Sequence, residues 1–424
     1  MSDKRVNDEK NMPNGQNPPH LKWNFFMGVI HGVFYKAGMT FSEPNTILPL
    51  FLNSFTQSKS IIGLFGTLFQ FSGAWPQLLT AQKAEALCRK KPLLIVMLVI
   101  RMTSWGVLGA LTYFYGARHP GWILAIFLLL LSIFYLAGGV AGIPFFDIIA
   151  RTIPTRMRGR FWGLRQFLGG LLAIGAGFLV KYILANPNLP FPQNYAVLFF
   201  LSFTFLIVSY LGLGSMKEPP KKSCPPAKPF NLFLIQAFRT LRKDKNFGRA
   251  IFTEILAGSL LLSLSFYILY AKNQLKIDPS FVGIFIATQM LAGVISNVVW
   301  GILSDKKGSR AVIQGALLFH FSIPLFALLA RGPFLYLMVF LGIGFYMNGA
   351  SIGFTNFMLE VAPEEKRPLY ISLRGTLVAV ISFFPLIGGV FIDLFSFRAI
   401  FLTVLVISVL ANYSAFRLEE PRKS

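Results

Sequence analysis

Residues 279–310 read PSFVGIFIATQMLAGVISNVVWGILSDKKGSR, and this stretch decides the class of the protein. Its first part, 279–304, contains no Asp, Glu, Lys or Arg, whereas charged residues crowd the last part. An uncharged apolar stretch of about 18 residues or more can cross the hydrocarbon core of a bilayer as a helix. We therefore predict a membrane-spanning helix that is followed at once by a short basic loop.

Similar apolar stretches recur along the whole chain of 424 residues, and only 13% of its residues are charged. A soluble domain carries about 25% charged residues, so a water-soluble enzyme of this size is excluded. We predict an all-α integral membrane protein with twelve transmembrane helices. The expected spans are 24–54, 60–80, 92–115, 121–149, 162–184, 195–214, 248–271, 279–302, 311–330, 334–359, 369–392 and 398–416.

The formal net charge of +23 does not indicate a nucleic-acid partner, because the basic residues lie mostly in short segments between apolar stretches. Such segments face the cytoplasm and the anionic lipid headgroups there. Most basic residues fall on one side when both termini are placed inside. We expect a multi-pass protein of the bacterial inner membrane with both termini in the cytoplasm, and membrane lipids as partners.

The two halves of the chain repeat each other. Pro154, Arg158, Leu164 and Arg165 fall on Pro363, Arg367, Leu373 and Arg374 at an offset of 209 residues. Gly63 and Gly283 correspond near the start of the second span of each half. Parallel repeats of six helices are a known plan of transporters. We therefore predict two pseudo-symmetric six-helix bundles.

The domain boundaries follow from these spans. We expect a disordered cytoplasmic tail at 1–22, bundles at 23–214 and 248–416, and a cytoplasmic C-terminal tail at 417–424. Between the bundles, residues 215–247 open with a Pro/Lys stretch and continue with apolar residues at helical spacing. This pattern indicates an amphipathic helix on the cytoplasmic membrane surface. An ordinary solvated linker helix explains it equally well.

The loop Gly301-Ile302-Leu303-Ser304-Asp305-Lys306-Lys307-Gly308-Ser309-Arg310 resembles the loop motif of the major facilitator superfamily, G-x-x-x-D-[RK]-x-G-[RK]-[RK]. Only Ser309 departs from it. The first-half loop keeps the basic end of the motif but lacks its Gly and Asp, and Glu85 is the residue that could replace the Asp. The resemblance implies that spans 1, 4, 7 and 10 line a central cavity. It also implies that Asp305 has a gating role at a nearby helix N-terminus.

Ionisable residues inside predicted spans are costly and therefore are candidates for function. On this ground we single out Lys36, Glu43, Arg101, Glu254 and His31 as candidates for the substrate or proton path. Two of them have a structural alternative: Glu43 precedes Pro44 and could cap a broken helix, and Glu254 could reach the cytoplasmic surface. His31 is more often a hydrogen-bonded packing residue, and the same holds for His320.

A second group of charges clusters at the predicted cytoplasmic ends of spans 4, 5, 8, 9, 10 and 11. Similar charges occur at equivalent positions in both halves. This repetition favours a gate of salt bridges that break when the inner side opens. The expected gate residues are Asp147, Arg158, Arg165, Asp305, Arg310, Glu360, Arg367 and Arg374.

These features predict a secondary active transporter of a small organic solute, with proton coupling through a buried carboxylate. No phosphate-binding loop of the form G-x-x-x-x-G-K-[ST] is present, and we expect neither a cofactor nor a metal. Lys36 and Arg101 hint at an anionic substrate, and the many Phe residues leave an amphipathic one open. A lipid-moving protein or a transport-dead sensor on the same scaffold is the alternative, and an intramembrane enzyme is remote. We expect a monomer.

Overall fold

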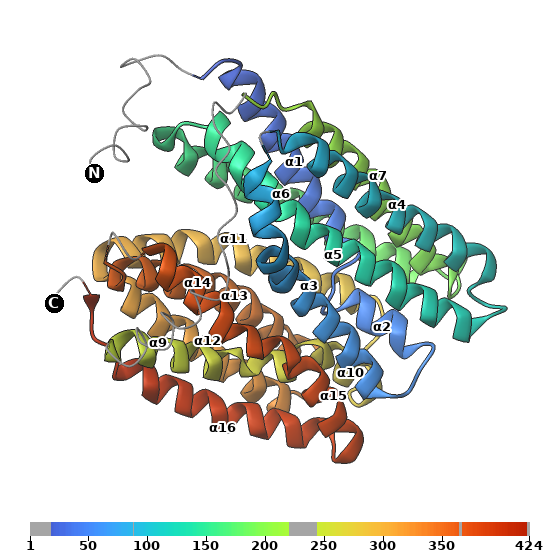
Figure 1. Ribbon diagram of the computed structural model, residues 1–424. Coiled ribbons are helices and arrows are strands. Elements are labelled where there is room, and N and C mark those ends of the chain that lie inside the picture. Colours follow the sequence, from blue (N-terminus) through green and yellow to red (C-terminus); the bar gives the residue numbers. More distant parts are fainter. Residues whose placement is uncertain (1–17, 88, 220–243, 364–366, 422–424) are drawn as a thin grey trace, which may run out of the picture.

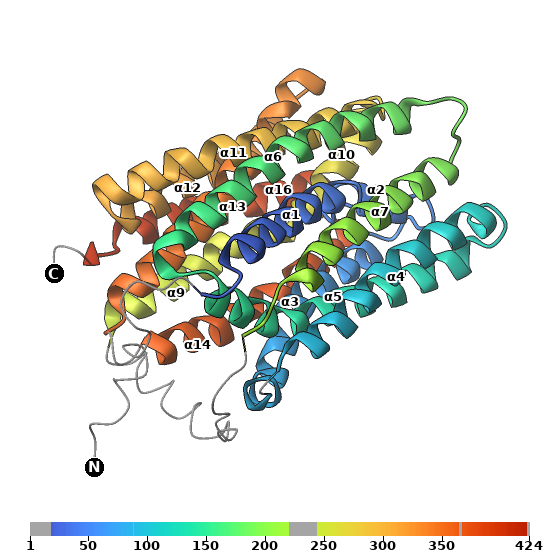
Figure 2. The ribbon, with the colours of Figure 1, turned by 90° about the horizontal axis from the view of Figure 1, so that it is seen from above.

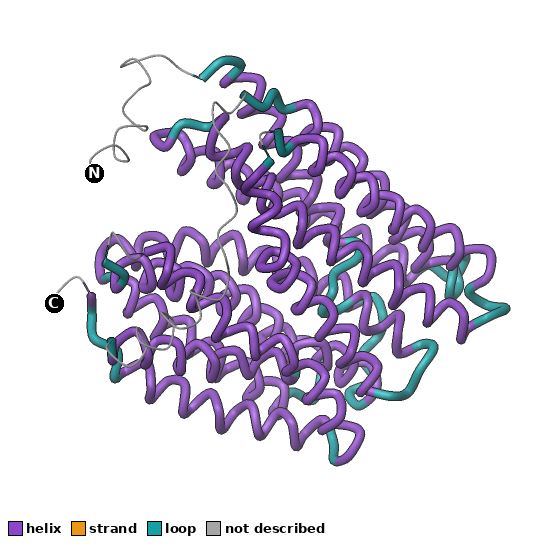
Figure 3. The backbone as a smooth tube through the Cα atoms, in the orientation of Figure 1, coloured by secondary structure: helices purple, strands orange, loops and turns teal. Residues whose placement is uncertain are grey.

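The computed structural model describes residues 18–87, 89–219, 244–363 and 367–421, with backbone alone for 73–86, 367–369 and 372. All regular elements of this part are helices (Figure 3). They are α1 (Leu21–Thr40), α2 (Ile47–Asn53), α3 (Lys59–Ala86), α4 (Lys91–Tyr115), α5 (Pro120–Thr152), α6 (Thr155–Ala185), α7 (Gln193–Ser215), α9 (Lys245–Ala257), α10 (Tyr267–Asn273), α11 (Phe281–Lys307), α12 (Ser309–Leu329), α13 (Pro333–Val361), α14 (Arg367–Val378), α15 (Phe384–Leu394) and α16 (Phe397–Phe416).

The helices form two bundles, α1–α7 and α9–α16, as Figure 1 shows. Ten helical segments of the described chain are long and apolar enough to cross a bilayer. The helices α1 and α3 are not among those ten but pack in the first bundle, α1 against α6 and α7, and α3 against α5. The all-α membrane fold is thus confirmed, and the total of twelve spans stays a prediction.

Three predicted spans are interrupted. The first span divides into α1 and α2 around Pro44, and the eleventh changes to a 3₁₀ turn, Ala379–Phe383, directly before Phe384 and Pro385. Proline lacks the N–H that continues a helix and crowds the preceding turn, which explains both breaks. The seventh span contains two 3₁₀ turns between α9 and α10, at Gly258–Leu262 and Leu264–Phe266.

Each bundle ties its first helix to the segment after its last helix by the same device. The amide of Asn24 donates to the Lys217 carbonyl at 3.1 Å and accepts from the Lys217 N–H at 2.8 Å. In the second bundle, Asn246 makes the same reciprocal pair with Glu419, with both distances 3.1 Å. This equivalence supports the predicted repeat at a position that the sequence comparison had not singled out.

The two bundles meet along α3 and α15 and along α6 and α11. Figure 2 shows α6 and α11 side by side from above. Glycines permit these contacts: a side chain at Gly63 would collide with the Pro385 carbonyl, and one at Gly283 with the Gly177 carbonyl. We call the end of the molecule that carries these glycines the far end. The opposite end, where α1 starts and α16 ends, is the terminal end, and there the bundles diverge (Figure 1).

Two parts of the predicted domain division fall outside the described residues. Most of the proposed amphipathic helix lies at 220–243, and most of the N-terminal tail lies at 1–17. The helix bounds lie close to the expected bundle bounds, since α1 begins at Leu21 and α7 ends at Ser215. The division into tails, bundles and linker therefore stays a prediction.

Candidate functional site

A cavity of about 450 Å³ lies between the bundles, at the middle of the helices. Residues from α1 and α6 form one wall, and residues from α11 and α13 form the other. We call it the central cavity. Its polar and charged lining is Tyr35, Lys36, Thr40, Glu43, Trp162, Arg165, Gln166, Gln289 and Asn348. The cavity thus brings together residues that are far apart in sequence and that belong to both halves of the chain.

Lys36 lies in this cavity, as expected for a candidate of the substrate path. Its aliphatic stem lies over Gly169 of α6, where a Cβ would be 3.3 Å from Lys36 Cβ and Cδ. No hydrogen bond or ion pair joins the Lys36 ammonium to another of the described residues. The glycine therefore makes room for the lysine stem against α6.

Glu43 also lines the cavity, at the break between α1 and α2. Its Oε2 accepts from the Asn45 N–H and from the Thr46 hydroxyl, both at 2.8 Å, and its Oε1 accepts from the Asn45 amide at 3.1 Å. The side chain is buried, being 5% exposed. Both interpretations of Glu43 are compatible with this geometry, because the carboxylate stabilises the helix break and still borders the cavity.

Arg165 reaches the central cavity from α6. Its Nη1 donates to the Gly28 carbonyl of α1 at 2.5 Å, and its guanidinium lies 5.0 Å from the centre of the Trp162 ring. Gly32 leaves the space that the guanidinium occupies. This residue was expected at the gate, and its described contacts lie within the first bundle.

Arg374, the repeat equivalent of Arg165, has a different partner. Its Nε and Nη2 donate to both oxygens of Glu254 of α9 at 2.7–3.1 Å, so the pair is bidentate. The pair borders a second cavity of about 210 Å³, between α3, α9, α13 and α14. Met347 of α13 lines both cavities. Glu254 therefore lines the neighbouring cavity and not the central cavity, and Met347 is common to the two.

Arg101 and His31 lie inside the first bundle, behind the cavity wall. Arg101 donates to the Tyr35 hydroxyl at 2.9 Å, and its guanidinium lies 4.4 Å from the centre of the Phe134 ring. His31 Nδ1 lies 2.7 Å from the Ser209 hydroxyl oxygen. Since that hydroxyl donates to the His31 carbonyl at 2.9 Å, the ring must donate from Nδ1. Neither residue borders the central cavity. Arg101 is connected to it by its hydrogen bond to Tyr35, which lines the cavity.

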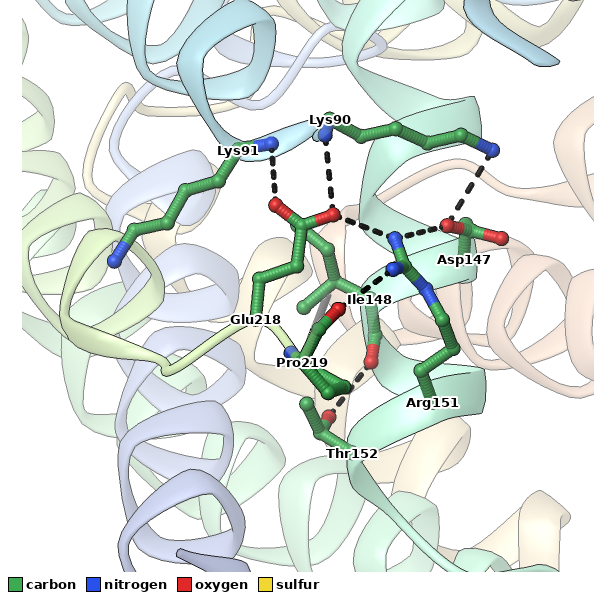
Figure 4. A network of polar contacts seen from close by, with 8 residues as sticks. All are labelled: Lys90, Lys91, Asp147, Ile148, Arg151, Thr152, Glu218 and Pro219. Carbon is green, nitrogen blue, oxygen red and sulfur yellow. Dashed lines mark hydrogen bonds and ion pairs between the residues drawn. The ribbon is translucent and has the colours of Figure 1, made fainter. Parts of the chain in front are cut away.

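Asp147 belongs to a charge network at the terminal end (Figure 4). Arg151 bridges the carboxylates of Asp147 and Glu218, each at 2.5 Å, and the Lys90 ammonium lies 3.3 Å from Asp147. Glu218 accepts from the backbone N–H groups of Lys90 and Lys91 at the start of α4, at 3.0 and 2.9 Å. Glu218 thus caps the start of α4, whereas Glu85, considered as a replacement for the Asp of the loop motif, lies where only the backbone is described.

Three of the remaining gate candidates, Arg158, Glu360 and Arg310, each bind a group of their own bundle. Arg158 donates to the carbonyls of Ile153 and Ala150, at the end of α5. Glu360 accepts from the Ser309 hydroxyl at the start of α12, and Arg310 donates to the Phe416 carbonyl at 2.9 Å. Asp305 lies on α11, two residues before its end. Arg367 begins α14, and its side chain lies outside the described part.

His320, weighed as a packing residue, is fully buried on α12, with Nε2 3.4 Å from the Ser259 hydroxyl. It is stacked on Tyr346 of α13, with ring centres 5.0 Å apart. His320 lines neither of the two cavities described above. In the described part of the chain, no group of three His, Cys, Asp or Glu side chains could hold a metal ion.

Asp393, at the end of α15, is a polar link between the bundles that sequence reasoning missed. Its carboxylate accepts from the N–H groups of Lys59 and Ser60, at 2.9 and 2.8 Å, and thereby caps the start of α3 in the other bundle. The Thr67 hydroxyl joins the same interface by accepting from the Leu386 N–H at 3.0 Å. The sequence signal was an isolated acid directly after the uncharged stretch 375–392.

The model of the Major Facilitator Superfamily matches residues 32–384 and, in a second match, 264–424. The chain belongs to the Major Facilitator Superfamily. It is therefore an integral, multi-pass membrane protein of a transporter family, and the resemblance carried by the loop at 301–310 is confirmed. The repeat that the sequence predicted is the repeat of this family's fold.

Solved structures with the same fold share little sequence with this chain. A mutant of the nucleoside transporter NupG is 13% identical with a TM-score of 0.69, covering 94% of this chain and 99% of that one. A bacterial homologue of the iron transporter ferroportin, in its inward-facing state, is 13% identical with a TM-score of 0.70, covering 93% and 98%. A bacterial homologue of the human lysosomal transporter Spinster, inward-facing, is 15% identical with a TM-score of 0.68, covering 95% and 97%.

One curated relative is a fungal protein, autophagy-related protein 22-1 of Neosartorya fischeri. It is 29% identical over 143 residues, and the match covers 30% of this chain. The chain covers only 23% of that relative's length. The likeness therefore carries no specific activity over to this chain.

Proposed function

We propose that this protein is a secondary active transporter that carries a small organic solute across the membrane by alternating access. The observation that carries this proposal is the central cavity, which both bundles line. The bundles are in close contact at the far end and diverge at the terminal end. Rocking of one bundle against the other would close the terminal end and open the far end around the same cavity.

The direction of the present opening follows from the topology that the basic residues favour. With both termini in the cytoplasm, the terminal end faces inward, and the structure corresponds to an inward-open state. We propose a bacterial inner membrane as the location and a monomer as the working unit, because each chain contains both walls of its cavity.

The coupling ion is proposed to be the proton. Glu43 is a buried carboxylate on the cavity wall, and no cation pairs with it among the described residues. A carboxyl group in such a place can take up and release a proton as the cavity changes sides. Glu254 is the second candidate, because uptake of a proton there would break its bidentate pair with Arg374.

The proposal is tested by reconstituting the full chain in liposomes with an imposed pH gradient and a panel of radiolabelled solutes. We expect at least one solute to accumulate in a gradient-dependent way in the parent. Glu43→Gln or Glu254→Gln should retain exchange of that solute but lose accumulation driven by the gradient. Glu419→Gln, a change at an exposed ion pair of the terminal end, is the matched control. Uptake that ignores the gradient in the parent and in both variants would refute proton coupling.

A lipid-moving protein on the same scaffold is the second candidate function. Many large apolar side chains of the described part are exposed toward the expected bilayer, and the central cavity is bordered by polar groups. The polar lining favours a water-soluble solute. Movement of a fluorescent phospholipid between leaflets in the same liposomes, without solute exchange, would support the lipid function instead.

A further inference from the structure

The charges on the wall of the central cavity do not balance. Lys36 and Arg165 contribute two cations, and Glu43 contributes the one carboxylate among the described lining residues. The Glu43 oxygens accept hydrogen bonds from Asn45 and Thr46, which hold them in the helix break. No described ion pair joins Glu43 to either cation. The cavity therefore presents a surplus of positive charge to whatever enters it.

An unpaired cation at this depth in a membrane protein is costly, and such a charge is usually met by a partner. The Arg165 guanidinium has the Gly28 carbonyl and the Trp162 ring, whereas Lys36 has only the stem contact with Gly169. We infer that the transported solute is a small organic anion whose acidic group is bound by Lys36 in the central cavity. This inference rests on the proposed transport function and specifies its substrate class.

The opposite wall of the central cavity indicates which hydrogen-bonding groups the rest of the solute carries. The Asn348 amide nitrogen donates to the Gly293 carbonyl at 2.7 Å and to the Ser296 hydroxyl at 3.0 Å, which leaves its oxygen as an acceptor. Gln289 adds a second amide on the same wall. Neutral amides bind hydroxyl or amide groups without a charge. The anionic end thus faces the first bundle, and an uncharged polar end faces the second.

The size and apolar lining of the cavity limit the solute further. Ligand sites enclose about 300–1,000 Å³, and this one, at about 450 Å³, suits a single small molecule. Met39, Met290 and Met347 supply adaptable apolar surface, and Trp162 supplies an aromatic face. These residues favour a carboxylate or phosphonate on a compact apolar or aromatic body that also carries the uncharged polar group.

A solute of this kind would also explain how binding favours closure. Its acidic group would contact α1 and α6, while its other end would contact α11 and α13. A ligand that touches both walls binds more tightly when they approach each other. Lys36 could instead serve as a proton carrier, and in that case the preference for anions would be absent.

The test uses probes matched in shape that differ in charge. Thermal unfolding of the purified full chain in detergent is measured with benzoate, phenylphosphonate, benzamide and benzylamine. The proteins compared are the parent, Lys36→Gln, Lys36→Arg and Lys245→Gln, whose substituted lysine is exposed at the start of α9. Unfolding without probe first establishes that each variant is folded.

We expect benzoate or phenylphosphonate to raise the Tm of the parent and of Lys36→Arg and Lys245→Gln, while benzamide and benzylamine do not. Lys36→Gln should need at least about tenfold more anion for the same shift, because the charged hydrogen bond to the acidic group is lost and tenfold corresponds to about 1.4 kcal/mol. The inference is overturned if no anion raises the Tm, if the neutral or cationic probes act equally, or if Lys36→Gln responds as the parent does.

The outcome for the substrate class remains separate from the outcome for transport. Solute exchange in the reconstituted parent with a neutral or cationic solute, together with no Tm response to anions, would retain the transporter and refute the anion. Absence of any exchange, with a Tm response to anions that depends on Lys36, would retain the anion site and refute transport.

Discussion

Asp393, at the end of α15, accepts hydrogen bonds from the hydroxyl and the backbone N–H of Ser60, at the start of α3, at 2.6 and 2.8 Å. The two residues belong to different bundles, so this carboxylate caps a helix across the interface at the far end. A negative charge at a helix N-terminus satisfies free N–H groups and interacts favourably with the helix dipole. The contact stabilises the state in which the far end is closed.

Asp393→Asn should therefore favour opening of the far end. Loss of an N-cap side chain costs about 1 kcal/mol, and the expected shift of the equilibrium is about fivefold or less because asparagine keeps one acceptor. The measurement is the rate at which a membrane-impermeant maleimide labels Ala271→Cys, at a site that is 1% exposed near the far end. Ser58→Ala, which removes one contact of 3.2 Å to Asp393 and one of 3.4 Å from the Ile61 N–H, is the control and should have a smaller effect. Slower labelling in Asp393→Asn would contradict the proposed role of Asp393 in keeping the far end closed.

Arg165→Ala and Arg374→Ala should each reduce transport at least about tenfold while membrane insertion remains normal. Each arginine makes contacts of about 2.5–3.1 Å with the first helix of its own bundle, and a lost charged hydrogen bond costs about 1.5–3 kcal/mol. The assay is solute exchange at equal amounts of protein in the liposomes. Normal exchange by both variants would remove these residues from the gate.

Replacement of the same two arginines by glutamine should lower the Tm by different amounts. Arg374→Gln leaves the Glu254 carboxylate, 13% exposed, without its bidentate partner, whereas Arg165→Gln leaves no described acid unpaired. We expect a larger fall in Tm for Arg374→Gln and a partial recovery in the double variant Glu254→Gln/Arg374→Gln. Equal falls for the two single variants, with no recovery, would contradict this difference.

Asn24→Ala and Asn246→Ala should destabilise their bundles to different degrees. Both remove a reciprocal pair of hydrogen bonds with the backbone, but Asn24 is fully buried, whereas Asn246 is partly exposed. A buried polar group left without its partner costs about 1–3 kcal/mol, while water can replace part of an exposed contact. Thermal unfolding should show the greater loss for Asn24→Ala. The reverse order would show that burial does not decide how much stability is lost with each reciprocal pair of hydrogen bonds.

Gly283→Leu should block closure of the far end and abolish transport. A side chain there meets the backbone of Gly177 and Lys181 on α6, which cannot move aside as a flexible side chain can. Gly175→Leu on α6 is the control, because nothing lies within 4 Å of its added Cβ and the position is exposed. Equal transport by both variants would exclude close packing of α6 and α11 as a requirement.

Much of the fold could be predicted because it depends on local composition. Uncharged stretches such as 279–304 indicate spanning helices, and the offset that relates Arg165 to Arg374 indicates the repeat. Periodicity alone did not reveal where a span breaks. The 3₁₀ turns of the seventh span contain no proline, so the sequence carries little local sign of them.

The candidate site was predictable only in part, because partners distant in sequence decide the role of a charge. Lys36 and Glu43 were found by their depth in a span, and both line the central cavity. Arg101 looked equally suited, yet it lies behind Tyr35 among aromatic rings. Glu218 and Asp393 were missed because each acts at a helix start that is remote in the chain.

The most direct test of alternating access measures both ends of the molecule at once. Spin-label pairs are placed at Arg160 and Lys307 at the terminal end, and at Arg118 and Arg331 at the far end, after Cys88 and Cys224 are replaced by serine. Pulsed electron resonance distances are recorded in lipid nanodiscs with and without a solute that the liposomes exchange. We predict that the solute shortens the terminal pair and lengthens the far pair. Distances that stay unchanged, or that change in the same direction at both ends, would contradict the account.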